Sequence, residues 1–176
     1  MKTEHTYKSL PSQMTKVQFL NCFGSVYESS PWIAETAWDL GQIDSKAIDS
    51  AEKLSSIFSQ IVDKASDKKK LALLNAHPDL AGKLAIAGKL TADSSKEQAG
   101  ADLQNCTKEE FEQFQKLNTN YKEKFGFPFI LAVQGYQRSE ILKIFEKRIK
   151  NSIEEEYKVA LAQVNRIALL RLGRIE

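Results

Sequence analysis

The sequence predicts an all-α protein, a compact single-domain bundle of about eight helices. From Met14 onward, nearly every segment spaces its apolar residues as a helix does, and no alternating strand pattern or hairpin turn is present. The 176 residues, 42% hydrophobic and 27% charged, suit one domain with its own core. We therefore expect a single helical domain over residues 13–176, preceded by a polar, flexible arm at residues 1–12.

Short breaks rich in glycine, proline or polar turn residues divide the helical part of the chain. They lie at residues 29–32, 40–44, 64–70, 76–79, 90–95 and 125–128. With typical helix lengths, these breaks give about eight helices. The run FPFILAVQG at 127–135 is ambiguous, because a short apolar stretch between proline and glycine fits a strand or the start of a buried helix. Its helical surroundings favour the helix.

The overall composition excludes several classes of function. The 25 basic and 23 acidic residues are spread along the chain, so the charge shows no nucleic-acid or membrane footprint. Cys22 and Cys106 are isolated, which supports neither a disulfide scaffold nor a zinc site. No apolar stretch approaches the roughly 20 residues of a membrane span, and no signal peptide is evident. We expect a cytoplasmic protein.

The stretch LNAHPDLAGKLA (74–85) contains the first candidate for chemistry. Proline disfavours a helical conformation in the residue before it and fits the first turn of a helix, so we expect a helix to begin at Pro78. His77 would then be its N-cap or a neighbour of the N-cap. The positive end of the helix dipole favours a neutral imidazole, which can both give and take a proton. The alternative is a surface histidine ahead of an ordinary helix start.

Three further segments carry polar groups that could serve structure or chemistry. Ser94 and Glu97 have the spacing of a capping box, and the carboxylate of Glu97 with the amide of Gln98 could also read a small ligand. The segment after Pro128 offers backbone amides that could bind an anion or a carbonyl oxygen. Arg171 lies on the apolar stripe of a helix over 160–172, where it is either paired, at the rim, or bound to a ligand carboxylate.

Motifs for a cofactor or metal are not found. The glycines of AGKLAIAGKL (81–90) have the wrong spacing for a phosphate loop, and one interior histidine without an HExxH pattern does not make a metal centre. Catalysis would therefore use side chains alone, with no cofactor and no metal.

Five segments together resemble the OHCU decarboxylase family, whose substrate is 2-oxo-4-hydroxy-4-carboxy-5-ureidoimidazoline. The resemblance runs from about Val17 to Leu172, and its motifs occur in the family's order. They are YESSPW (27–32), HPDL (77–80), SSKEQ (94–98), NTNYKEKFGFPFILAVQG (118–135) and RIALLRL (166–172).

The resemblance implies an all-α, cofactor-free lyase that converts OHCU to (S)-allantoin in urate breakdown. It assigns catalytic roles to His77, Glu97 and Arg171. It implies a small-molecule substrate as the partner, without nucleic acid or membrane, and is compatible with a homodimer. The substrate-binding residues that it implies are Pro78, Ser94, Ser95, Lys96, Gln98, Phe129, Ile130, Leu131, Ala132 and Val133.

Two alternatives stay open at this point. The first is a cofactor-free acid-base lyase acting on another small carboxylated heterocycle. The second is a helical binding module without catalysis, in which His77, Glu97 and Arg171 are only caps and ion pairs.

Overall fold

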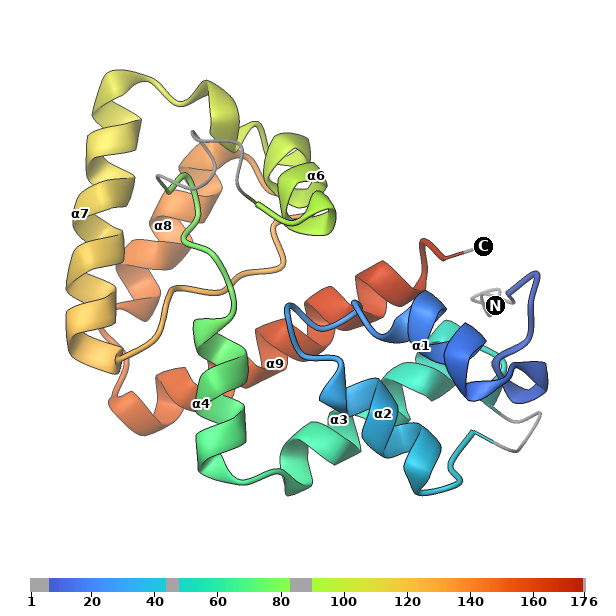
Figure 1. The fold of residues 1–176 in the computed structure, drawn as a ribbon. Coiled ribbons are helices and arrows are strands. Elements are labelled where there is room, and N and C mark those ends of the chain that lie inside the picture. Colours follow the sequence, from blue (N-terminus) through green and yellow to red (C-terminus); the bar gives the residue numbers. More distant parts are fainter. Residues whose placement is uncertain (1–6, 44–47, 83–89, 176) are drawn as a thin grey trace. The chain divides into compact units, whose positions relative to one another are not determined.

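The computed structural model describes residues 7–43, 48–82 and 90–175 (Figure 1). This described part contains eight α-helices and no strand, so the predicted fold class and helix number are confirmed. It forms two compact units, Met1–Ala76 with Asn165–Glu176, and His77–Val164. We call them the first and the second unit, and describe each by itself. The extent of a single domain over 13–176 stays a prediction.

The first unit packs its helices around aromatic rings. Phe19 lies at the centre, with ring centroids 5.0 Å from Phe23, 5.5 Å from Trp38 and 6.4 Å from Phe58. Three of these four side chains are fully buried, as apolar residues at helical spacing require. The helices of this unit are α1 (Lys16–Phe23), α2 (Trp32–Asp39), α3 (Ala51–Lys64), α4 (Asp67–Asn75) and the end of α9 (Ile153–Leu172), after the short 3-10 helix η1 (Pro11–Gln13).

The described part of the predicted N-terminal arm contacts this unit. Tyr7 is buried, with its ring centroid 5.3 Å from that of Phe23. Ser12 donates two hydrogen bonds to the carboxylate of Asp49, at 2.9 and 2.6 Å. Residues 1–6 lie outside the described residues, and the flexible arm over 1–12 stays a prediction.

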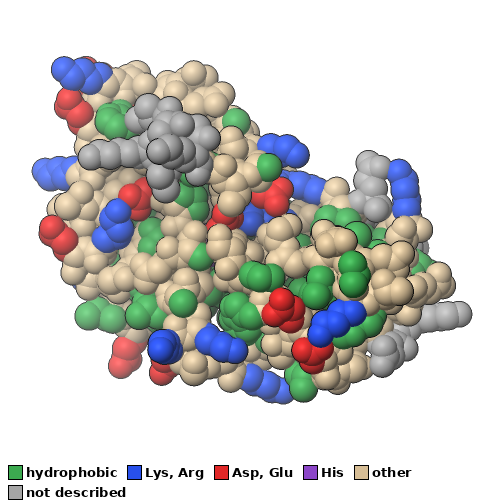
Figure 2. All heavy atoms as spheres, viewed as in Figure 1, with side chains coloured by type: hydrophobic (Ala, Val, Ile, Leu, Met, Phe, Trp, Pro, Cys, Tyr) green, Lys and Arg blue, Asp and Glu red, His purple; other side chains and the backbone are tan. Residues whose placement is uncertain are grey.

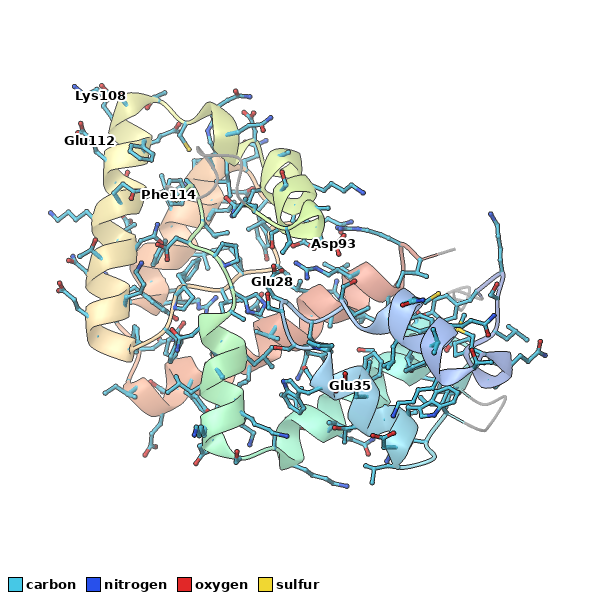
Figure 3. All side chains as sticks on the ribbon, in the orientation of Figure 1. Glu28, Glu35, Asp93, Lys108, Glu112 and Phe114 are labelled. Atoms are coloured by element: carbon cyan, nitrogen blue, oxygen red, sulfur yellow. The ribbon has the colours of Figure 1, made fainter. Side chains whose placement is uncertain are left out.

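The second unit consists of α6 (Ala92–Gly100), the 3-10 helix η3 (Leu103–Asn105), α7 (Lys108–Phe125), α8 (Arg138–Arg148) and the start of α9. The helix α7 begins with a capping box between Thr107 and Glu110 and ends at Gly126, whose φ of 78° favours glycine. Figure 3 shows Lys108 and Glu112 pointing away from the unit, while Phe114 of the same helix points inward. The helix is amphipathic in the usual way.

The core of the second unit is also aromatic. The ring centroid of Tyr121 lies within 5.5 Å of the ring centroids of Phe125, Phe129 and Phe145. Phe129 and Phe145 stack at 3.8 Å with an interplanar angle of 11°. The connection between α7 and α8 is therefore part of the core and not a surface loop.

This connection corrects one prediction, because the helix expected within 127–135 does not form. Residues 128–133 follow no helix, turn or bend, and run as an extended connection from α7 toward α8 (Figure 1). The five residues Phe129–Val133 are all buried. A buried backbone without helical bonds needs other partners, and side chains of α8 and α9 provide them, as described below.

No helix of the described residues is both long and apolar enough to cross a bilayer. On the face that Figure 2 shows, basic and acidic side chains are interspersed, with apolar side chains between them. The even distribution of charge along the sequence is thus also seen on this surface.

Candidate active site

The loop that follows α4 carries the candidate His77. The helix ends at Asn75, and residues 77–82 are not helical, so the helix expected to begin at Pro78 is not there. The imidazole therefore does not lie at the N-terminus of such a helix, and the expected dipole effect is wrong. His77 is only 9% exposed and Pro78 is half-buried. The alternative of a surface histidine is thereby excluded.

Side-chain amides replace the backbone partners that a helix would have provided to this loop. Gln98 of α6 bonds it twice, donating to the Asp79 carbonyl at 3.2 Å and accepting from the Ala81 amide at 3.0 Å. From α7, Gln115 donates to the Ala81 carbonyl at 2.9 Å and Asn118 donates to the Leu80 carbonyl at 3.0 Å. All three carbonyls from residue 79 to 81 are therefore satisfied by neighbouring helices. We call Gln98, Gln115 and Asn118 the amide clamp.

One further contact holds the loop, and one of its residues has a strained backbone. Lys122 of α7 forms an ion pair with Asp79 at 2.6 Å. Ala81 has φ of 48°, in the left-handed region that costs a residue with a side chain about 1 kcal/mol or more. A conformation with this cost persists only where surrounding bonds determine it, and the amide clamp provides such bonds.

The helix α6 carries three of its candidate residues, Ser94, Glu97 and Gln98, on one face. Its N-cap is Thr91, whose hydroxyl accepts from the Ser94 amide at 3.3 Å, so the predicted capping box at Ser94 and Glu97 is wrong. Thr91, three residues before Ser94, was the stronger signal for the N-cap. Ser94 and Gln98 are buried and Glu97 is half-buried, as expected for positions three and four residues apart on one face.

The remaining α6 candidates lie on the other side of the helix. Ser95 and Lys96 are exposed, while Ser94 and Gln98 are buried. Their side chains therefore do not share the buried face that bonds the His77 loop. The role of Ser95 and Lys96 in substrate binding stays a prediction.

The segment Phe129–Val133 is held from one side by charged and polar side chains. Arg148, the last residue of α8, donates to the Ile130 carbonyl at 2.7 Å. Gln163 of α9 accepts from the Ala132 amide at 3.0 Å. The amide of Leu131, between them, donates to no acceptor in the described part of the second unit.

A buried ion pair supports Arg148. Its Nε and Nη2 atoms donate to one oxygen of Glu156 at 2.9 and 2.6 Å, and both residues are buried, at 7% and 0% exposed. Asn151 donates to the other oxygen at 2.7 Å, and the Tyr121 hydroxyl also bonds to Glu156. Burial, together with this bond to a carboxylate, raises the pKa of Tyr121 well above its ordinary value, so the phenol remains a neutral donor. We call these four residues the Glu156 network.

Arg171 belongs to the first unit and is buried near the end of α9. It forms an ion pair with Glu28 at 3.0 Å and donates weakly to the Val26 carbonyl at 3.4 Å. Glu28, labelled in Figure 3, lies on the segment between α1 and α2. The expectation that an arginine on this apolar stripe is paired is thus confirmed for a protein partner. A contact of Arg171 with a ligand stays a prediction.

Comparison with known proteins adds the identity of the family. The OHCU decarboxylase family matches residues 12–173, nearly the whole chain. The chain belongs to this family. The 2-oxo-4-hydroxy-4-carboxy-5-ureidoimidazoline decarboxylase of Haloferax volcanii is 40% identical over 155 residues, covering 88% of this chain and 87% of the relative. The enzyme of the same name from Halalkalicoccus jeotgali is 39% identical over 164 residues, covering 93% and 88%.

A solved structure supports the assignment of this chain to the same family and fold. The crystal structure of (S)-allantoin synthase aligns with a TM-score of 0.72 at 32% identity. The alignment covers 92% of this chain and 50% of that one, so the chain spans about half the length of that solved protein. The family predicted from five sequence motifs is therefore confirmed, together with its all-α fold.

Sequence reasoning missed the residues that hold the candidate segments in place. Asn118 is the first residue of the motif at 118–135 and Gln115 precedes it, but the motif points to the family and to the amides after Pro128, and not to a role for these two side-chain amides. Arg148 and Glu156 occur in a stretch rich in charges, and such a composition is typical of a solvent-exposed face. Only the fold shows that these two charges are buried together.

Proposed function

We propose that this member of the OHCU decarboxylase family decarboxylates OHCU to (S)-allantoin in urate breakdown, with His77 and Glu97 as the acid-base pair and Arg171 orienting the substrate. The family match supports the reaction. One structural observation carries the proposal for the residues. Gln98, next to Glu97 on α6, bonds twice to the loop that begins at His77, which links the two candidates in one unit.

The reaction requires an acceptor for one electron pair, and it involves three proton transfers. When the bond between C4 and the carboxylate breaks, CO2 leaves and its electron pair flows into the ring C=N, whose nitrogen takes a proton. The C4 hydroxyl then gives up its proton as C4 becomes a carbonyl, and C5 takes a proton on one face. A positioned acid-base pair is worth about 10²–10⁴-fold in such transfers. A protonation confined to one face accounts for a single enantiomer.

The candidate residues have chemistry that suits these steps. His77 is buried and can both donate and accept a proton, and Glu97 is a half-buried carboxylate on the adjoining helix. The backbone of Phe129–Val133, with Pro78, Ser94 and Gln98, would bind the polar groups of the ring and the ureido arm. Arg171, by the family resemblance, would bind an anionic or carbonyl group with its planar guanidinium.

The test follows allantoin formation by circular dichroism. OHCU is made in situ from urate with urate oxidase and hydroxyisourate hydrolase, and wild type is compared with His77→Ala and with Lys108→Ala, an exposed control on α7. We expect a rapid (S)-allantoin signal in wild type and in the control, and its loss in His77→Ala. Slow, racemic product with wild type would refute the reaction. A His77→Ala variant as active as wild type would refute the role of the histidine.

The second candidate function, a lyase for another carboxylated heterocycle, is addressed by the same assay. Turnover of OHCU at a rate no higher than that of other ureido acids would favour it. A binding module without catalysis is the third possibility, and it predicts no turnover by any of these variants.

A further inference from the structure

The buried ion pair of Arg148 and Glu156 has no part in the proposed acid-base chemistry. Such a pair is weak evidence for stability, because the cost of desolvating two charges offsets most of their attraction. Besides its bonds to the Glu156 carboxylate, the Arg148 guanidinium donates one hydrogen bond to the Ile130 carbonyl at 2.7 Å. That bond lies within the segment Phe129–Val133, which the family resemblance assigns to substrate binding. This contact points to a function in placing the segment.

The direction of the bonds defines two edges of the segment. In an extended trans chain, the N–H and C=O of one residue point to the same side, and those of the next residue point to the opposite side. The Ile130 carbonyl and the Ala132 amide, two residues apart, bond to Arg148 and Gln163. The N–H and C=O of Leu131 therefore form the opposite edge. Neither has a hydrogen-bond partner within the described residues.

The side chain of the preceding residue strengthens this placement. The Arg148 guanidinium lies 4.5 Å from the centroid of the Phe129 ring, and that ring stacks on Phe145 at 3.8 Å. Arg148 thus contacts both the side chain of Phe129 and the next carbonyl, so the segment is fixed at consecutive residues. Glu156 accepts two hydrogen bonds from Arg148 and one each from Asn151 and Tyr121, and so holds the guanidinium in one orientation.

The contact also affects the electronics of one peptide group. The Ile130 carbonyl and the Leu131 N–H belong to the same peptide. A charged donor at the carbonyl polarises the group and makes the N–H a stronger donor. The Leu131 edge thus combines a strengthened donor with an acceptor, the pairing that an amide or ureide group of a ligand matches.

We propose that Arg148 and Gln163 are positioning residues, which hold one edge of the 129–133 segment so that the N–H and C=O of Leu131 are presented to a ureide substrate. The inference rests on the proposed function, since that function supplies the substrate. It adds a role for two side chains that do not touch the reacting atoms. Their effect is carried by the backbone between Ile130 and Ala132.

The first test uses Gln163, which is only half-buried and whose variants should fold. Gln163→Met removes the acceptor of the Ala132 amide, and we expect a rise in KM for OHCU of about 10-fold, within the range that a displacement of a binding group produces. Gln163→Glu retains an acceptor oxygen and should restore KM to near the wild-type value. A merely structural role would not give this rescue.

The second test uses Arg148→Lys with Arg138→Lys as the matched control. Both arginines lie on α8, and both bond to carboxylates and to a backbone carbonyl, but Arg138 bonds to Asp102 and Glu110 and not to the segment. We expect a 10- to 100-fold loss of kcat/KM in Arg148→Lys and little change in Arg138→Lys. The melting temperature of each variant is recorded, to separate this loss from unfolding.

An NMR titration with (S)-allantoin provides a readout besides activity. In ¹⁵N-labelled wild type and in Arg138→Lys, we expect the amide signal of Leu131 to shift downfield on addition of the product, and in folded Arg148→Lys the shift should be lost. An unchanged KM in Gln163→Met, or an unchanged Leu131 shift in Arg148→Lys, would overturn the inference while wild-type turnover stands. Absence of wild-type turnover overturns the proposed function, and the inference with it.

Discussion

Asn118 offers the sharpest test of the amide clamp. Its side chain is 2% exposed, and its amide donates to the Leu80 carbonyl at 3.0 Å. Its own carbonyl oxygen is buried and has no partner in the described part of the protein. Leucine has a similar size, so Asn118→Leu removes one hydrogen bond and leaves the packing nearly intact. The change therefore isolates the bond to the loop.

The magnitude follows from what the substitution leaves behind. The Leu80 carbonyl becomes a buried acceptor without a partner, which costs about 1–3 kcal/mol of the free energy of unfolding. For a chain of this size, each kcal/mol lowers the melting temperature by about 2–4 °C, so we expect a fall of about 2–12 °C. Because the loop begins at His77, we also expect kcat for OHCU to fall about 10-fold.

The assay combines thermal unfolding with allantoin formation by circular dichroism at a temperature where the variant is fully folded. Thr119→Val is the matched control, since Thr119 is the next residue on α7, is exposed, and bonds only within its own helix. The control should change neither quantity by much. If Asn118→Leu lowers the melting temperature but keeps wild-type kcat, the amide clamp does not position His77, and the reasoning fails.

Three further predictions concern single helices. Glu97→Gln should abolish activity without a change in melting temperature. The control Glu112→Gln, at an exposed position, should change neither activity nor melting temperature. If both variants are equally active, Glu97 has only a structural role. Thr91→Ala removes the N-cap side chain of α6 and should lower the free energy of unfolding, measured with denaturant, by about 1 kcal/mol. It should lower kcat less than Asn118→Leu does. Backbone and side-chain bonds from Ser152 lower the pKa of Glu155, so its contribution to stability is present above the pKa of the unfolded chain and is lost as the pH falls through the lower folded value. The difference in melting temperature between wild type and Glu155→Gln should therefore begin to shrink as the pH falls below about 4.3, the pKa of the unfolded chain, and vanish only below the lower pKa of the folded protein.

The sequence alone predicted what depends on local patterns and on combinations of motifs. Helical spacing predicted the all-α class, and the break predicted at 125–128 coincides with the end of α7 at Phe125. The predicted helix over 160–172 lies within α9, and Arg171 is buried and paired, one of the three alternatives expected from its position on the apolar stripe. The family followed from motifs in a fixed order, and the comparisons confirm it.

The errors arose where tertiary contacts override local signals. Proline and acid at 78–79 read as a helix start, but the amide clamp satisfies this backbone in a non-helical form. The run at 127–135 read as a helix because its neighbours are helical, but Arg148 and Gln163 bond its backbone in an extended form. In both cases the partners lie 17 or more residues away in sequence, beyond the reach of a local pattern.

The amide clamp also determines how the His77 loop exchanges hydrogen with solvent. The amide hydrogens of a loop usually exchange with solvent when the loop alone opens, which is fast. The Ala81 amide is buried and donates to Gln98 of α6, so it can exchange only when α6 separates from the loop. Its protection factor should therefore match that of amides in the middle of α6. The timescale on which His77 loses its fixed position is then the timescale on which a neighbouring helix opens.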